Sequence, residues 1–161
     1  MFLEDVIKLL VDAGVGVYGT TIFQSSNAKL PPASSTTSFL VLVEYGGAQP
    51  QELHESTDTP AYEFPFAQVT ARGSSRSSSQ ALAVAAYNVL SKNPATGKKR
   101  QNFTINNTYY VRLTCKQQPT LDLGPDEVGR IKYGFNIEAM KRPSQTAPLP
   151  IPPWTQGGWI Q

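Results

Sequence analysis

Three glycines near the N-terminus, Gly14, Gly16 and Gly19, have the G-x-G-x-x-G spacing that can bind the pyrophosphate of a dinucleotide. That chemistry requires a strand before the glycines and a helix after them, because the N–H groups of a helix N-terminus bind the phosphates. Here the order is reversed. Apolar residues at helical spacing predict a helix over 2–13 with Gly14 as its C-capping residue, and β-branched and aromatic residues predict a strand over 15–23. The motif therefore predicts a helix-to-strand turn, and no cofactor.

His54 is the single histidine and lies in the polar stretch ELHESTD. One histidine among loop carboxylates has no recognised metal-ligand spacing, and no nucleophile elbow accompanies it, so a Ser-His-Asp triad has no support. We expect a solvated histidine, no metal ion and no catalysis. A small-molecule-binding enzyme that uses His54 is the alternative from another class of function.

Basic residues gather in KNPATGKKR: Lys92, Lys98, Lys99 and Arg100. They have two interpretations. One is a solvated loop, with a lysine favourably placed near a helix C-terminus. The other is a charged rim in which Lys98, Lys99 and Arg100 face DNA phosphates. The net charge of +2 is too small to indicate nucleic-acid binding by itself, although a ring of identical copies would multiply the local field.

The elements that must position these residues follow from hydrophobic periodicity. Strands are predicted over 37–47, with an apolar run at 39–43 covered on both faces, and over 64–71, where Pro65 indicates an edge or a strand start. A capping box Ser77-x-x-Gln80 begins a second helix that Asn93-Pro94 ends. Residues 24–36 and 46–62 are predicted as polar loops.

The last third of the chain has the clearest strand signals. Asn106-Asn107 predicts a two-residue hairpin between QNFTI and the strand from Thr108. Two alternating strands follow, separated by a turn at Gly124-Pro125-Asp126. In one strand Tyr109, Val111, Leu113 and Cys115 alternate with the residues between them, and in the other Ile131, Tyr133, Phe135 and Ile137 do the same. Cys115, the single cysteine, is expected to be a small buried side chain.

Helices and strands are segregated along the chain, which predicts an α+β fold with a mainly antiparallel sheet flanked by two helices. We expect this domain to occupy residues 1–142. Residues 143–161 contain five prolines and predict an extended tail outside it. Trp154 and Trp159 lie in that tail, which either docks on a partner or folds back over its own domain. We expect no membrane span and no signal peptide.

Several stretches together resemble a known family. They are MFLEDVIKLLVDAG, FLVLVEYGG, FPFAQVTARG leading into SSSQALAVAAYNVL, and YYVRLTCKQQPTLDLGPDEVGRIKYGFNIEA. In order and length, about residues 1–141 resemble the tail terminator proteins of long-tailed, non-contractile bacteriophages, which are often called minor capsid proteins. The tail after Pro143 has no counterpart in this resemblance.

The resemblance implies a structural protein that assembles in the host cytoplasm and resides at the head-tail junction of the virion. There it would form a ring, typically a homohexamer, that caps the tail tube protein, stops its polymerisation and offers a docking surface to the head. Double-stranded DNA would pass through the lumen without sequence recognition. A strand edge near Pro65, or a loop arm, is the expected ring contact. The nearest alternative is another neck component, a head-completion or connector protein.

Overall fold

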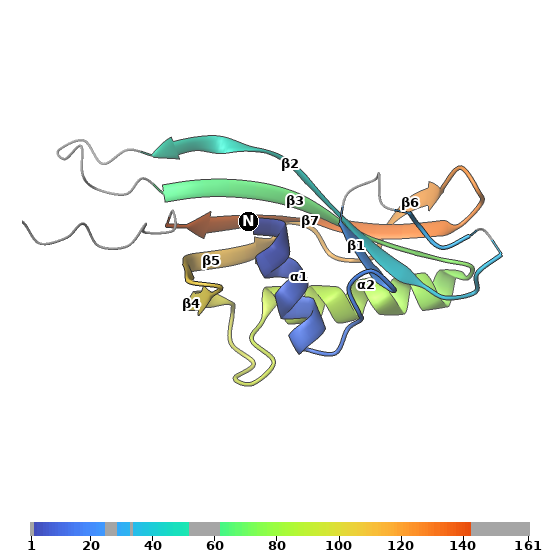
Figure 1. Cartoon of the computed structure of the whole chain (residues 1–161), viewed down its shortest axis with the longest axis horizontal. Coiled ribbons are helices and arrows are strands. Elements are labelled where there is room, and N and C mark those ends of the chain that lie inside the picture. The colour runs from blue at the N-terminus through green and yellow to red at the C-terminus, as the bar shows by residue number, and fades with distance from the viewer. Residues whose placement is uncertain (1, 25–28, 33, 52–61, 143–161) are drawn as a thin grey trace, which may run out of the picture.

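The computed structural model describes residues 2–24, 29–32, 34–51 and 62–142, with the backbone alone at 48–51. Two helices lie against one face of a seven-stranded sheet (Figure 1). The helices are α1 (Phe2–Asp12) and α2 (Arg76–Ser91). The strands are β1 (Ile22–Gln24), β2 (Phe39–Gln51), β3 (Tyr62–Gly73), β4 (Gln101–Ile105), β5 (Thr108–Cys115), β6 (Leu121–Pro125) and β7 (Ile131–Lys141).

The sheet has the strand order β1-β2-β3-β7-β5-β4, and β6 pairs with β7 beside β5. Only the β1–β2 pair is parallel among the described strands. The long central pairs β2–β3 and β3–β7 are antiparallel and form the middle of the sheet. The predicted α+β class with a mainly antiparallel sheet is confirmed.

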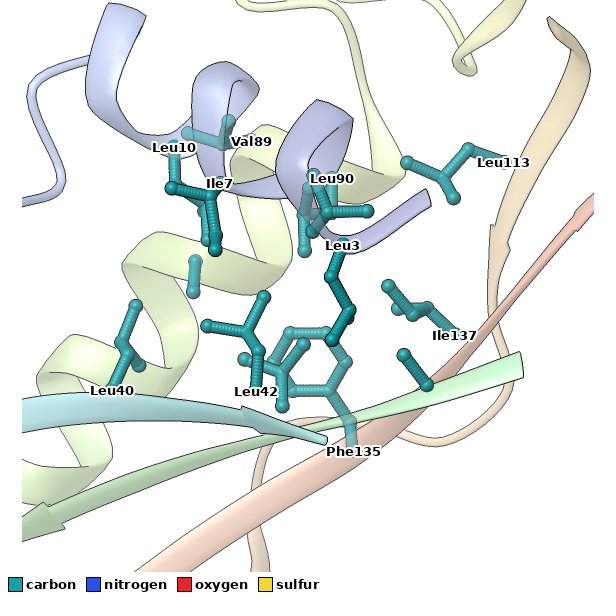
Figure 2. Packing of buried hydrophobic residues seen from close by; sticks show 14 of the residues in the cluster. Leu3, Ile7, Leu10, Leu40, Leu42, Val89, Leu90, Leu113, Phe135 and Ile137 are labelled. Carbon is teal, nitrogen blue, oxygen red and sulfur yellow. The ribbon is translucent and has the colours of Figure 1, made fainter. Parts of the chain in front are cut away.

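The main core lies between the sheet and the helices (Figure 2). Leu3, Ile7 and Leu10 of α1 and Leu90 of α2 point towards strand residues such as Phe135 (Figure 2). Each large side chain buried here stabilises the fold by about 1.5–3 kcal/mol relative to its exposed state. The small residues of α2, such as Ala83 and Ala86, are fully buried and let that helix lie close to the sheet.

The central apolar run of β2 is buried on both faces, as predicted. Leu40 and Leu42 belong to the main core, whereas Phe39 and Val41 form a second cluster with Phe23. Phe23 and Phe39 meet edge to face, with ring centroids 5.7 Å apart. A strand with apolar residues at consecutive positions therefore needs cover on both sides of the sheet.

Helix α1 ends as its sequence predicts. The N–H of Gly14 donates to the carbonyl of Val11 (2.9 Å), and the N–H of Val15 donates to that of Leu10 (3.0 Å). This is a Schellman motif, and it requires the positive φ of +74° that Gly14 adopts. The glycine motif begins at a helix C-terminus, where the dipole repels phosphate.

Three predicted boundaries are wrong. The N-terminal strand covers Ile22–Gln24 rather than 15–23, because residues 15–21 form a turn. Residues 46–51, predicted as loop, continue β2 through two register shifts that accommodate its glycines and proline. Helix α2 begins at Arg76, and its N-cap is Ser75, whose hydroxyl accepts the N–H of Ser78, so the box at Ser77 does not form.

The C-terminal half follows the predictions more closely. Asn106 and Asn107 take φ values of +46° and +63° in the two-residue hairpin between β4 and β5. The alternation of β7 is confirmed, with Tyr133, Phe135 and Ile137 buried. Strand β6 was not predicted, because its alternation covers only Leu121–Leu123 before Gly124-Pro125, a pair that predicts a turn.

One predicted alternation changes face partway along β5. Tyr110 pairs with Lys141 of β7, but Arg112 pairs with Met140, so Val111 is an extra residue in a β-bulge. The bulge places Tyr110 rather than Tyr109 in the core, together with Leu113. Sequence periodicity alone cannot locate such an insertion, because it depends on the partner strand.

The bulge brings the Tyr110 hydroxyl to a buried carboxylate. Asp5 of α1 is 2% exposed. It accepts hydrogen bonds from the Tyr110 hydroxyl (2.5 Å) and from the Asn106 amide (2.8 Å). Burial, and then this hydrogen bond, raise the pKa of the Tyr110 phenol well above its ordinary value, so Tyr110 stays protonated as the donor. The cluster ties the first turn of α1 to the β4–β5 hairpin.

We expect Tyr110→Phe to lower the free energy of unfolding by about 1–3 kcal/mol, because Asp5 loses a donor in a site that water does not reach. Urea denaturation measures the loss. Tyr109→Phe is the matched control, since the Tyr109 hydroxyl bonds Asn102 at the exposed surface and its removal should cost less than about 0.5 kcal/mol. Equal losses in the two variants would contradict this role of Asp5.

Candidate functional site

The basic cluster lies in the loop between α2 and β4. The loop is held by its own backbone: the Asn93 N–H donates to the Lys98 carbonyl (2.8 Å), and the Asn93 carbonyl accepts the N–H of Gly97 (2.8 Å). Its turns leave Lys98 and Lys99 exposed. No ion pair in the described part of the chain involves Lys92, Lys98 or Lys99, so their ammonium groups are available for an external anion.

Arg100 points inward and caps α2. Its side chain is 9% exposed. It donates from Nε and Nη2 to the Val89 carbonyl (3.0 and 2.8 Å) and from Nη2 to the Lys92 carbonyl (3.3 Å). The guanidinium also lies over the Phe103 ring, 5.5 Å from its centroid. Burial lowers the pKa of Arg100 from its ordinary value. These bonds satisfy carbonyls that a helix end leaves free, so the Arg100 guanidinium is bonded within the fold. The phosphate-facing role stays a prediction for Lys98 and Lys99.

A shallow depression of about 280 Å³ lies beside the two lysines. Its lining joins their loop to the start of β4 and includes the amides of Asn93, Gln101 and Asn102. Ammonium and amide groups donate hydrogen bonds. Around this depression they lie on an open surface and do not enclose one small molecule. The surface therefore suits repeated, non-specific contact with anionic oxygens better than recognition of a particular ligand.

The remaining predicted site residues divide into two groups. His54, Trp154 and Trp159 lie outside the described residues, as does the tail from residue 143. Pro65 lies near the beginning of β3, opposite Gly47 at a register shift, but β3 is an interior strand between β2 and β7. Of the two predicted alternatives for Pro65, the sheet edge is therefore wrong, whereas a position near the start of a strand is what the structure has.

Reactive chemistry has little support in the described part of the chain. No group of three or more His, Cys, Asp or Glu side chains there could hold a metal ion. Cys115 is half-buried against the core, and burial raises the pKa of its thiol to about 12. The thiol is thus protonated at neutral pH and is a poor nucleophile. Neither described helix has the length and apolar composition needed to cross a membrane.

Sequence reasoning missed a second surface, the turn between α1 and β1. The carbonyl of Val17 accepts N–H groups from Thr21 (2.9 Å) and Ile22 (3.0 Å), and the Val17 N–H donates to the Thr21 hydroxyl (2.8 Å). Gly19 holds a φ of +79°. A Cβ atom at residue 16 would lie 2.5 Å from the Thr21 hydroxyl oxygen. The glycine motif therefore builds a tightly bonded turn.

That turn presents two apolar side chains to solvent. Val17 is 61% exposed and Tyr18 is 57% exposed, while Ile22, four residues after Tyr18, is fully buried. Val11, in the last turn of α1, is also exposed. The reversed glycine motif was the available sequence signal, because it predicts a turn at this point and turns lie at the surface.

At the other end of the sheet, charged groups hold the β6–β7 turn in place. One oxygen of Asp126 accepts the N–H groups of Val128 (3.1 Å) and Arg130 (2.8 Å). The other oxygen lies 3.6 Å from Nη1 of Arg72 and 3.5 Å from Nε of Arg130. The Arg130 guanidinium stacks on Phe39 at 5.1 Å from the ring centroid. These contacts neutralise the charge of the buried arginine within the fold, although its Nε and Nη1 atoms are buried without a hydrogen-bond partner.

Comparison with known proteins shows what this arrangement resembles. No protein-family model matches the sequence, and no curated protein matches it. Among solved structures, the chain is similar to a chain of the "virion of native gene transfer agent (GTA) particle", with a TM-score of 0.53 and 13% sequence identity. The two chains share a fold. The similarity covers 87% of this chain and 93% of the other, so it joins whole chains rather than a common fragment.

We expect Arg100→Lys to lower the free energy of unfolding by about 1.5–3 kcal/mol, because an ammonium group cannot reproduce the forked bonds to the end of α2. Thermal or urea denaturation measures the change. Lys99→Gln, at the neighbouring exposed position, should change stability by less than about 0.5 kcal/mol. An unchanged stability in Arg100→Lys would show that the cap contributes nothing.

Proposed function

We propose that this protein is a structural component of a phage-like virion, where it forms a ring that caps the tail tube. The observation that carries the proposal is the fold shared with a virion chain over 87% of this chain. The resemblance of residues 1–141 to tail terminator proteins supports the narrower role.

The described side chains favour a function performed by surfaces rather than by reactive groups. The Cys115 thiol is protonated, each oxygen of Asp5 accepts a hydrogen bond within the fold, and Arg100 caps a helix. What the domain offers to partners is shape, exposed lysines and an apolar turn. A ring that stops polymerisation needs only this: one face that binds the end of the tube and another that offers no site for a further tube subunit.

Ring closure requires two different surfaces on each copy, related by a rotation that closes. The sheet supplies different edges. Strand β1 pairs with β2 only as far as Leu42, so the described part of β2 beyond it pairs with β3 alone. At the opposite edge β4 pairs only with β5 among the described strands. Unpaired edge groups that a second chain can meet are a common basis for association.

The proposed place is the head-tail junction, with the tail tube protein on one side and a head-completion or connector protein on the other. DNA would pass through the lumen and meet Lys98 and Lys99 through its phosphates, without base recognition. A second neck role, as a head-completion or connector protein, draws equal support from the shared fold. Electron microscopy of tails that lack heads separates the two, because a terminator stays on the tail.

We expect addition of the purified protein to polymerising tail tube subunits to arrest growth and leave a ring at one tube end, since the cap removes the surface that the next subunit needs. Negative-stain electron microscopy measures tube length and end structure. An unrelated small protein at equal concentration is the control. Tubes whose lengths and ends are unchanged by excess protein would refute the terminator role.

We expect the double variant Lys98→Ala and Lys99→Ala to bind double-stranded DNA more weakly. The slope of log K against log salt concentration should become shallower by about one to two, because each lost phosphate contact releases about one counterion fewer. Fluorescence anisotropy at several salt concentrations measures both. The double variant Lys29→Ala and Lys132→Ala, which removes the same charge elsewhere, should change the slope little. Equal losses in the two variants would refute a DNA-facing loop.

A further inference from the structure

The α1–β1 turn has the properties of a protein-binding surface. Its backbone is held by the bonds around Val17 and Thr21, so binding would not have to order it. Tyr18 combines a large apolar ring with a polar tip, a residue type that often dominates interface energetics. A preordered surface of this kind binds with a small loss of conformational entropy. The exposed Val-Tyr pair on this rigid turn is therefore a candidate binding surface.

The chain itself contains a segment of matching chemistry. Residues 143–161 hold both tryptophans and five prolines and contain no charged side chain. Docking such a segment against Val17 and Tyr18 desolvates no charge. Its prolines restrict the unbound chain, so that less entropy is lost on binding.

Arg142, the residue before the segment, is held by the domain. The N–H of Arg142 donates to the Tyr109 carbonyl (3.0 Å). The Arg142 guanidinium lies over the rings of Tyr109 and Tyr62, 5.2 and 5.8 Å from their centroids. Strand β7 ends at one extremity of the sheet, whereas α1 and the turn after it lie on the helix side, nearer the middle (Figure 1). A chain that continues the direction of β7 leads away from the turn of its own copy.

The length of the segment is sufficient to reach a neighbouring copy, and the direction of β7 favours the neighbour over the same copy (Figure 1). A proline-rich segment extends by about 3.1 Å per residue, so residues 143–161 could span about 60 Å. A domain of this size is only about 40 Å across, from a radius of gyration of about 14 Å. We infer that Val17 and Tyr18 of one copy form the docking surface for the segment carrying Trp154 and Trp159 of a neighbouring copy. This inference rests on the proposed ring, in which it supplies one of the head-to-tail contacts.

Tryptophan fluorescence of the full-length protein tests the inference directly, because both tryptophans lie in the segment. We expect emission shifted to the blue of the urea-unfolded protein and protected from acrylamide. The double variant Val17→Ser and Tyr18→Ser should lose the shift and show severalfold stronger quenching. Leu121→Ser with Val128→Ser, which alters two other exposed apolar side chains, should retain the wild-type spectrum.

Mixing identifies which copy holds the segment. A chain with intact tryptophans but Val17→Ser and Tyr18→Ser is combined with a chain carrying Trp154→Phe, Trp159→Phe and an intact turn. Docking between copies predicts that the blue shift returns on mixing. Docking within one copy predicts two other results: the blue shift does not return on mixing, and the blue shift of the wild-type protein survives dilution to monomers. Together these results would overturn the inference.

Two further outcomes overturn it. One is solvent-like emission from wild-type protein that native mass spectrometry finds as a ring. The other is emission that shifts only when tube subunits are added, which would assign the segment to the tube. Neither outcome bears on the capping role, because that role is tested by the length of the tubes. Conversely, a blue shift that returns on mixing, together with unchanged tube lengths, would support the docking and reject the terminator function.

Discussion

The burial of one sheet face beneath two helices is the constraint on which the rest of the structure depends. It fixes where α1 and α2 must end, and each helix end leaves carbonyl groups that need partners. Gly14 closes α1 through a Schellman motif, and Arg100 closes α2 with its guanidinium. The loops that follow these caps are therefore tightly shaped. One presents Val17 and Tyr18 and the other presents Lys98 and Lys99.

Both candidate surfaces thus follow the end of a helix. The charged fraction of 16% is low, and several charges are used internally, such as Arg130 and Asp126 beneath the β6–β7 turn. Under the proposed function, the domain would contribute its shape and its sheet edges to an assembly. The fold shared with a virion chain agrees with such a use.

Features that depend on neighbouring residues in the chain were predictable. The amphipathic pattern of α1, the Asn106-Asn107 hairpin and the alternation of β7 each follow from local geometry, and the double-faced burial of residues 39–43 follows from a continuous apolar run. Features that depend on a distant partner were not. The bulge at Val111 exists only in relation to β7, and β6 exists because β7 offers it a free edge. The inward turn of Arg100 depends on the position of the α2 carbonyls.

The sequence by itself thus determined the α+β class, most of the elements and the absence of a nucleotide-binding context around the three glycines, since each rests on hydrogen bonds and periodicities within a few residues. The tertiary structure alone decided which side chains remain for partners. Exposure is a property of the whole packed domain: it assigned Arg100 to a helix cap, placed Pro65 in an interior strand and left Val17 and Tyr18 in solvent.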